Sequence, residues 1–126
     1  MNNLNIELTK YTPEIKMDAS EGLISMSGKS YPENTFEFYK PIMDWMEEYF
    51  DGNAKDKTSI NLEIIYFNSS SSKLFFDFFD LVEEASEDNQ IEINWIYDEE
   101  NESALEAGED FKEDFESLTF NLVVKP

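Results

Sequence analysis

Apolar and polar residues alternate in six stretches of the chain, and this period of two is typical of β-strands. The clearest stretch is residues 59–66, where the alternation predicts that Ile64 and Tyr66 share one face and that Ile65 lies on the other. The composition of residues 18–22 predicts a turn that joins two stretches into a hairpin. The predicted strands lie at residues 4–8, 15–17, 23–27, 59–66, 91–95 and 118–124.

Between these strands, apolar residues recur at steps of three and four, which is the spacing of one helical face. The pattern predicts helices over residues 36–50, 74–82 and 105–115. Ser30-Tyr31-Pro32-Glu33 fits a capping box, with Ser30 as the N-cap, Pro32 in the first turn and Glu33 three residues after Ser30. Pro41 lies inside the first helix, and we expect it to bend or split that helix.

The order of these elements predicts an α/β fold in a single domain over residues 1–126. We expect a mixed, mostly parallel sheet with an N-terminal hairpin and three or four helices, joined by right-handed crossovers. In such a sheet, each helix that follows a strand begins at the carboxyl edge of that strand. Three helix N-termini are therefore expected to share one rim, formed by residues 30–34, 68–73 and 97–101.

Four consecutive serines, residues 69–72, lie at one of these strand-to-helix junctions. We expect Ser69 at the N-cap or just before it, where a hydroxyl contributes about 1 kcal/mol. One hydroxyl is enough for a cap, so four exceed that need. Lys73 falls in the first turn, where a cation opposes the helix dipole unless an anion is sometimes present. The run fits either a cap and turn or a phosphorylation site, since a phosphate would add roughly −1.5 to −2 charges there.

The charge and composition narrow the possible functions. The chain carries 29 acidic and nine basic residues, for a net charge of −20, which repels nucleic acid and anionic membranes but suits a basic surface on another protein. It contains no arginine, histidine or cysteine. These absences exclude nucleophile pairs that use histidine, zinc sites of Cys and His, disulfides and guanidinium clamps. The sequence shows no signal peptide and no apolar run long enough to span a bilayer, so we expect a cytoplasmic protein. No cofactor is expected.

The most acidic segment, residues 98–116, carries ten carboxylates and one lysine, Lys112. Residues 98–102 lack the central glycine of a calcium loop, so no metal site is predicted. A solvated helix face is the simpler interpretation. Paired carboxylates could also serve a hydrolase, but nothing in the sequence places two of them across a pocket. No catalytic residue is therefore assigned, and the chain is not expected to be an enzyme.

Several blocks, in this order and spacing, resemble the SiaC family of bacterial regulatory phosphoproteins. The blocks are residues 11–15, 30–34, 38–41 with Trp45, 66–73, and 95–98 with 108–111. Members of this family are similar to the STAS-type anti-sigma-factor antagonists, so the resemblance implies a STAS-like fold. It also implies a non-enzymatic switch. The resemblance implies that a Ser/Thr protein kinase phosphorylates one hydroxyl of the serine motif and that a PP2C-type phosphatase removes the phosphate.

The family resemblance further implies that the unphosphorylated form binds and activates a diguanylate cyclase or another regulatory protein, which raises cyclic di-GMP and favours biofilm growth. Carried over by position, the phosphoacceptor is Ser69, with Ser70 as the fallback. The family commonly has Thr at this position, and the STAS antagonists place Asp where Asn68 stands here. The neighbouring residues expected to bind the partner are Asn68, Ser70, Ser71, Ser72, Lys73, Tyr31, Pro32, Glu33 and Asn34.

One alternative remains open from the residues alone. The chain could be an acidic adaptor or inhibitor that occupies a basic groove on another protein through its charge of −20. Binding of that kind would weaken steeply with salt and would be indifferent to Ser69.

Overall fold

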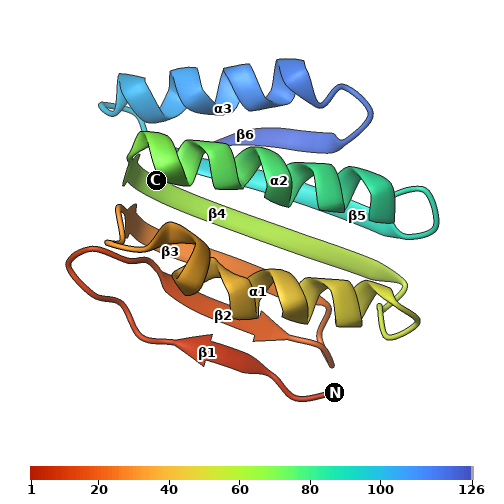
Figure 1. Ribbon diagram of the computed structural model, residues 1–126. Helices are drawn as coiled ribbons and strands as arrows, with labels where there is room; N and C mark the ends of the chain where they lie inside the picture. The colour runs from red at the N-terminus through yellow and green to blue at the C-terminus, as the bar shows by residue number, and fades with distance from the viewer. Residues whose placement is uncertain (126) are drawn as a thin grey trace.

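The computed structural model describes residues 1–125 and contains one six-stranded sheet with three helices packed on one of its faces (Figure 1). The strands are β1 (Leu4–Ile6), β2 (Glu14–Asp18), β3 (Leu23–Ser30), β4 (Lys57–Phe67), β5 (Gln90–Asp98) and β6 (Thr119–Lys125). The helices are α1 (Thr35–Phe50), α2 (Ser69–Ala85) and α3 (Glu102–Asp114). None of these helices is both long and apolar enough to cross a membrane.

The six strands lie in the sheet in the same order as in the sequence. β1, β2 and β3 pair antiparallel, and β3, β4, β5 and β6 pair parallel. Each parallel connection passes through one helix, as parallel strands require. The predicted α/β fold, with a mixed, mostly parallel sheet and an N-terminal hairpin, is confirmed.

The core lies between the sheet and the helices and is rich in aromatic side chains. Alternate residues of each central strand point toward the helices, and the apolar stripe of each helix covers them. This is the arrangement that the two periodicities require. The largest fully buried side chains include Trp95, Tyr39, Tyr49, Phe75, Phe78 and Phe79.

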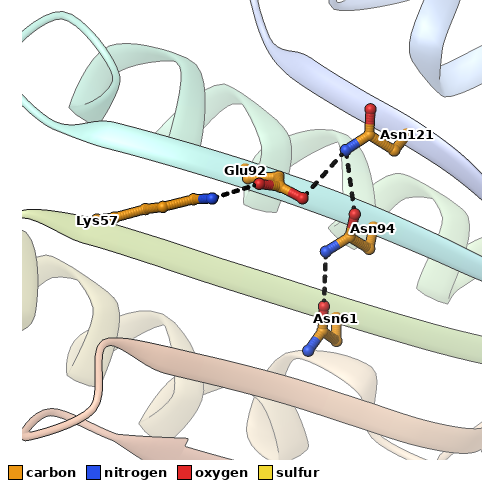
Figure 2. A network of polar contacts seen from close by, with 5 residues as sticks. All are labelled: Lys57, Asn61, Glu92, Asn94 and Asn121. Atoms are coloured by element: carbon orange, nitrogen blue, oxygen red, sulfur yellow. Dashed lines mark hydrogen bonds and ion pairs between the residues drawn. The ribbon is translucent and has the colours of Figure 1, made fainter.

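The opposite face of the sheet carries a ladder of amide side chains (Figure 2). Asn94 donates to Asn61 at 2.9 Å, and Asn121 donates to Asn94 at 3.1 Å. Beside this ladder, Lys57 forms an ion pair with Glu92 at 2.8 Å. These hydrogen bonds pair side chains across adjacent strands, which stabilises a sheet face that no helix covers.

The predicted capping box at the start of α1 is wrong. Ser30 is the last residue of β3 and is fully buried, and Pro32 lies in the loop before the helix rather than in its first turn. The N-cap is Asn34, whose Oδ1 accepts from the backbone N–H of Glu37 at 3.0 Å. Pairing with β4 holds Ser30 in the sheet, so the helix begins four residues later than its capping-box pattern suggested.

Pro41 does not split α1, which is continuous over its 16 residues. The proline has no N–H, so the carbonyl of Glu37 lacks its usual partner within the helix. Both residues are exposed, so water can bond to that carbonyl instead. The expected break is therefore avoided because the missing hydrogen bond falls on the solvent side of the helix.

Candidate functional site

The three helices begin at the same edge of the sheet, as predicted (Figure 1). Each has an asparagine N-cap whose side chain accepts a hydrogen bond from the backbone N–H three residues later: Asn34, Asn68 and Asn101. The N–H of Asn68 also donates to the carbonyl of Ser30 at 3.1 Å, which joins the start of α2 to the end of β3. Asn101 donates through Nδ2 to the carbonyl of Ile65 at 3.1 Å, which joins α3 to the end of β4.

The serine run begins one position further into the helix than predicted. Asn68, not Ser69, is the N-cap of α2, and its Oδ1 accepts from the N–H of Ser71 at 2.9 Å. Ser69 is the first helical residue, and both Ser69 and Ser70 are exposed. Because Asn68 supplies the cap, neither exposed hydroxyl is needed for it. Both hydroxyls are accessible to an enzyme that modifies them.

Ser71, in contrast, is fully buried, so its predicted place on an exposed partner-binding surface is wrong. Its Oγ lies 2.7 Å from Ser30 Oγ, which lies 2.6 Å from the hydroxyl of Tyr39. Burial raises the pKa of Tyr39 to about 12, against the opposing effect of its hydrogen bond to Ser30. This buried hydroxyl chain ties the first turn of α2 to β3 and α1.

Lys73 is exposed and lies one helical turn after Ser69. Residues four apart on a helix are neighbours on its surface. Within residues 1–125, no carboxylate forms an ion pair with Lys73. A phosphate on Ser69 would therefore find a free cation within reach, together with the positive end of the α2 dipole.

A β-bulge brings an aromatic residue to this rim. The register between β3 and β4 shifts after Gly28, which pairs with Ile64, so that Ile65 is skipped and Tyr66 pairs with Lys29. Such a bulge moves every later side chain to the other face of the strand. The prediction that Tyr66 shares the face of Ile64 is therefore wrong, and Tyr66 is 54% exposed.

Three tyrosines, Tyr11, Tyr31 and Tyr66, form an edge-to-face row that we call the tyrosine cluster. Their ring centroids are 5.3 Å and 5.7 Å apart, and the N–H of Tyr31 donates to the carbonyl of Tyr11 at 2.8 Å. Tyr66 precedes Ser69 by three residues, so the cluster lies beside the start of α2. Of these three tyrosines, only Tyr31 is among the partner-binding residues predicted from the sequence. The other two join it through the bulge and long-range pairing, which no local pattern indicates.

A groove of about 570 Å³ opens at the other end of the tyrosine cluster. The predicted partner-binding residues Tyr31, Pro32 and Glu33 line it, and Asn34 follows as the cap of α1. The groove is completed by Thr9, Tyr11 and Thr12. Exposed tyrosines of this kind are enriched at protein interfaces, because the ring is apolar and the hydroxyl bonds to polar partners. The rim is therefore suited to binding another protein.

Within residues 1–125, no group of three or more His, Cys, Asp or Glu side chains is placed to hold a metal ion. At this rim, the hydroxyl of Ser69 lies near Lys73 and the tyrosine cluster. None of the predicted partner-binding residues is a general base in contact with that hydroxyl. Such a surface can bind a partner and accept a modification from another enzyme.

Known proteins match this chain over nearly its whole length. The family model for SiaC family regulatory phosphoproteins matches residues 6–125. A curated relative, an uncharacterized protein of Pseudomonas aeruginosa strain UCBPP-PA14, is 37% identical over 115 residues, which cover 90% of each chain. The crystal structure of apo-SiaC from Pseudomonas aeruginosa matches over 100% of both chains, with a TM-score of 0.86 and 35% sequence identity.

A second solved structure contains a relative with a partner. It is the diguanylate cyclase SiaD in complex with its activator SiaC, from Pseudomonas aeruginosa. The match covers 96% of this chain and 97% of the matched chain, with a TM-score of 0.85 and 35% identity.

Proposed function

Since this chain belongs to the SiaC family of regulatory phosphoproteins, we propose that it is a non-enzymatic switch that binds a signalling partner through the rim around Ser69 and is controlled by phosphorylation of that serine. The proposed partner is a diguanylate cyclase, because a SiaC relative forms a complex with the cyclase that it activates. A protein kinase adds the phosphate, and a PP2C-type phosphatase removes it.

The observation that carries this proposal is the position of the Ser69 hydroxyl. It is exposed at the first residue of α2, three residues from Tyr66 and four from Lys73. The buried Ser71 is inaccessible, which supports Ser69 as the acceptor and Ser70 as the fallback. Both hydroxyls lie where the helix dipole favours an anion.

The same geometry gives a physical reason for a switch. A partner that packs on the tyrosine cluster must exclude water from the neighbouring start of α2. A phosphate on Ser69 would place roughly −1.5 to −2 charges at that boundary, and removing them from water opposes docking. The unphosphorylated chain is therefore the binding form. The proposed partner surface comprises Tyr11, Tyr31, Pro32, Glu33, Asn34, Tyr66, Asn68, Ser70, Ser72 and Lys73.

Intact-mass measurement with the cognate kinase and ATP tests the acceptor. We expect one phosphate on the wild type and on Ser70→Ala, and none on Ser69→Ala. Purified cyclase then tests the switch: wild type and Ser69→Ala should bind it and raise its rate of cyclic di-GMP synthesis, whereas the phosphorylated wild type should do neither. Full phosphorylation of Ser69→Ala, or equal cyclase binding by the phosphorylated and unphosphorylated chains, would contradict the proposal.

The net charge of −20 favours one second candidate, an acidic adaptor that binds a basic groove. Its binding would fall steeply as salt rises from low to physiological concentration. It would also be unaffected by phosphorylation of Ser69. A salt titration of cyclase binding, repeated with phosphorylated protein, separates the two functions.

A further inference from the structure

A second groove lies between α2 and α3; of the proposed partner surface, it shares only Ser72. These helices are neighbours on the same face of the sheet (Figure 1), and the groove between them has a volume of about 480 Å³. Three phenylalanines and an alanine form its apolar part, three carboxylates of α3 form its acidic part, and one serine of α2 completes it. These residues are Phe67, Phe76, Phe111 and Ala107, then Asp110, Glu113 and Asp114, and Ser72.

The apolar part of the groove is firmly held. Phe76 is 38% exposed although it is a large aromatic residue on a helix. Its ring centroid lies 5.3 Å from that of Phe111 and 6.0 Å from that of Phe115, and both of these rings are buried. An exposed aromatic ring backed by buried rings presents a preorganised apolar surface, so little conformational entropy is lost when a ligand covers it.

The acidic part of the groove is uncompensated. Asp110, Glu113 and Asp114 are exposed on α3, and within residues 1–125 no lysine forms an ion pair with any of them. A complementary ligand must therefore bring apolar side chains for Phe76 and cations for α3. Lysine or arginine beside leucine-like residues on one helix meets both needs.

We propose that the groove between α2 and α3 docks a basic amphipathic helix of a partner protein. The groove lies between one turn of α2, at Ser72 and Phe76, and the stretch of α3 from Ala107 to Asp114, so a third helix can lie against both. A second copy of this chain is a poor occupant, because α1, α2 and α3 each carry a single lysine and the chain as a whole carries −20. The inference goes beyond the proposed function, since this docking requires neither the Ser69 hydroxyl nor a change in its phosphorylation.

The test uses a synthetic peptide of leucine and lysine, with the leucines at steps of three and four, as the probe. A peptide with glutamate in place of lysine is its control. Titration into isotope-labelled protein should shift the amide resonances of α2 and α3 around Phe76 and Asp110 before those of other elements. The glutamate peptide should cause no shifts.

Two sets of variants separate the groove from general charge attraction. Combined Asp110→Asn, Glu113→Gln and Asp114→Asn should weaken binding of the lysine peptide about tenfold, equivalent to about 1.4 kcal/mol. Combined Glu21→Gln, Glu48→Gln and Glu87→Gln removes the same charge from exposed positions outside the groove and should leave affinity within about twofold, which is less than about 0.5 kcal/mol.

Phe76→Ser tests the apolar part, with Phe36→Ser at a 72% exposed position of α1 as its control. We expect Phe76→Ser to weaken binding and Phe36→Ser and Ser69→Asp not to weaken it. If Phe76→Ser fails to fold, the exposed carboxylate variants still decide the question. Equal loss of affinity in both carboxylate sets, shifts centred on another element, or protein dimers in place of a peptide complex would overturn the proposal.

Discussion

The Oγ atoms of Ser30 and Ser71 lie 2.7 Å apart, although 41 residues separate the two serines in the chain. Both side chains are fully buried, so each hydroxyl depends on the other, and on Tyr39, for the hydrogen bonds that water would otherwise supply. The contact fixes the first turn of α2 from beneath. The exposed serines of the same turn are thereby presented on a rigid backbone.

Replacement of Ser71 by alanine should lower the free energy of unfolding by about 1 kcal/mol, because one buried hydrogen bond is lost while Ser30 keeps its bond to Tyr39. Urea denaturation measures this loss, and a double-mutant cycle with Ser30→Ala isolates the coupling. The control, Ser70→Ala, is exposed and should change stability by less than about 0.5 kcal/mol. No coupling in the cycle would contradict the buried contact.

Removal of the α2 cap by Asn68→Ala should also cost about 1 kcal/mol, because the N–H of Ser71 loses its acceptor. Asn68→Asp keeps an acceptor oxygen and places a negative charge at the helix N-terminus, so it should retain wild-type stability or exceed it. Hydrogen exchange at the amide of Ser71 should accelerate in the alanine variant alone. Equal exchange in both variants would show that Asn68 is not the cap.

Stability should fall at alkaline pH through Tyr39. Its pKa is raised to about 12 in the folded protein, mainly by burial, from 10.0 for an ordinary tyrosine. Between these values the folded state holds the proton that the unfolded state has lost. The contribution is therefore complete below pH 10 and is lost as the pH rises toward 12, up to about 3 kcal/mol in total. Urea denaturation across this range should show a shallower decline for Tyr39→Phe than for the wild type.

Gly108→Ala should destabilise the protein by about 1–3 kcal/mol, although alanine normally favours a helix over glycine. A Cβ at position 108 would lie 2.5 Å from Cδ1 of Trp95 and 2.9 Å from Cδ2 of Leu122. Trp95 has little room to move, because it is fully buried and its Nε1 donates to the carbonyl of Ala104 at 2.9 Å. Thermal unfolding compares this variant with Glu106→Ala, an exposed substitution on α3 that should have little effect.

The strands, the helices and their shared rim could be predicted because each follows from a short-range pattern. One face of an element must be apolar if that face is to be buried, and the spacing of such residues identifies the element. The prediction that the three helices begin at one rim depended only on the order of strands and helices, because the carboxyl ends of parallel strands lie at one edge of the sheet.

The errors at Ser30, Tyr66 and Ser71 share a cause, which is that long-range contacts decided each position. A serine with a glutamate three residues later fits a capping box locally, but Ser30 is instead the last residue of β3. Strict alternation places Tyr66 on the same face of the strand as the buried Ile64, but the bulge at Ile65 moves Tyr66 to the other face, where it is exposed. Four equivalent serines in the sequence become inequivalent once Ser71 meets a residue 41 positions away. No local pattern in the sequence carries these contacts.

The agreement between strand order and sequence order has a consequence for how the protein is made. Every strand pairs only with the strand next to it in the chain, so no pairing waits for a distant segment to be synthesised. The hairpin of β2 and β3 needs only a tight turn, and each later strand adds to an existing edge after one crossover. The sheet can therefore grow from one side while the ribosome is still adding residues, with β6 as the last strand to join.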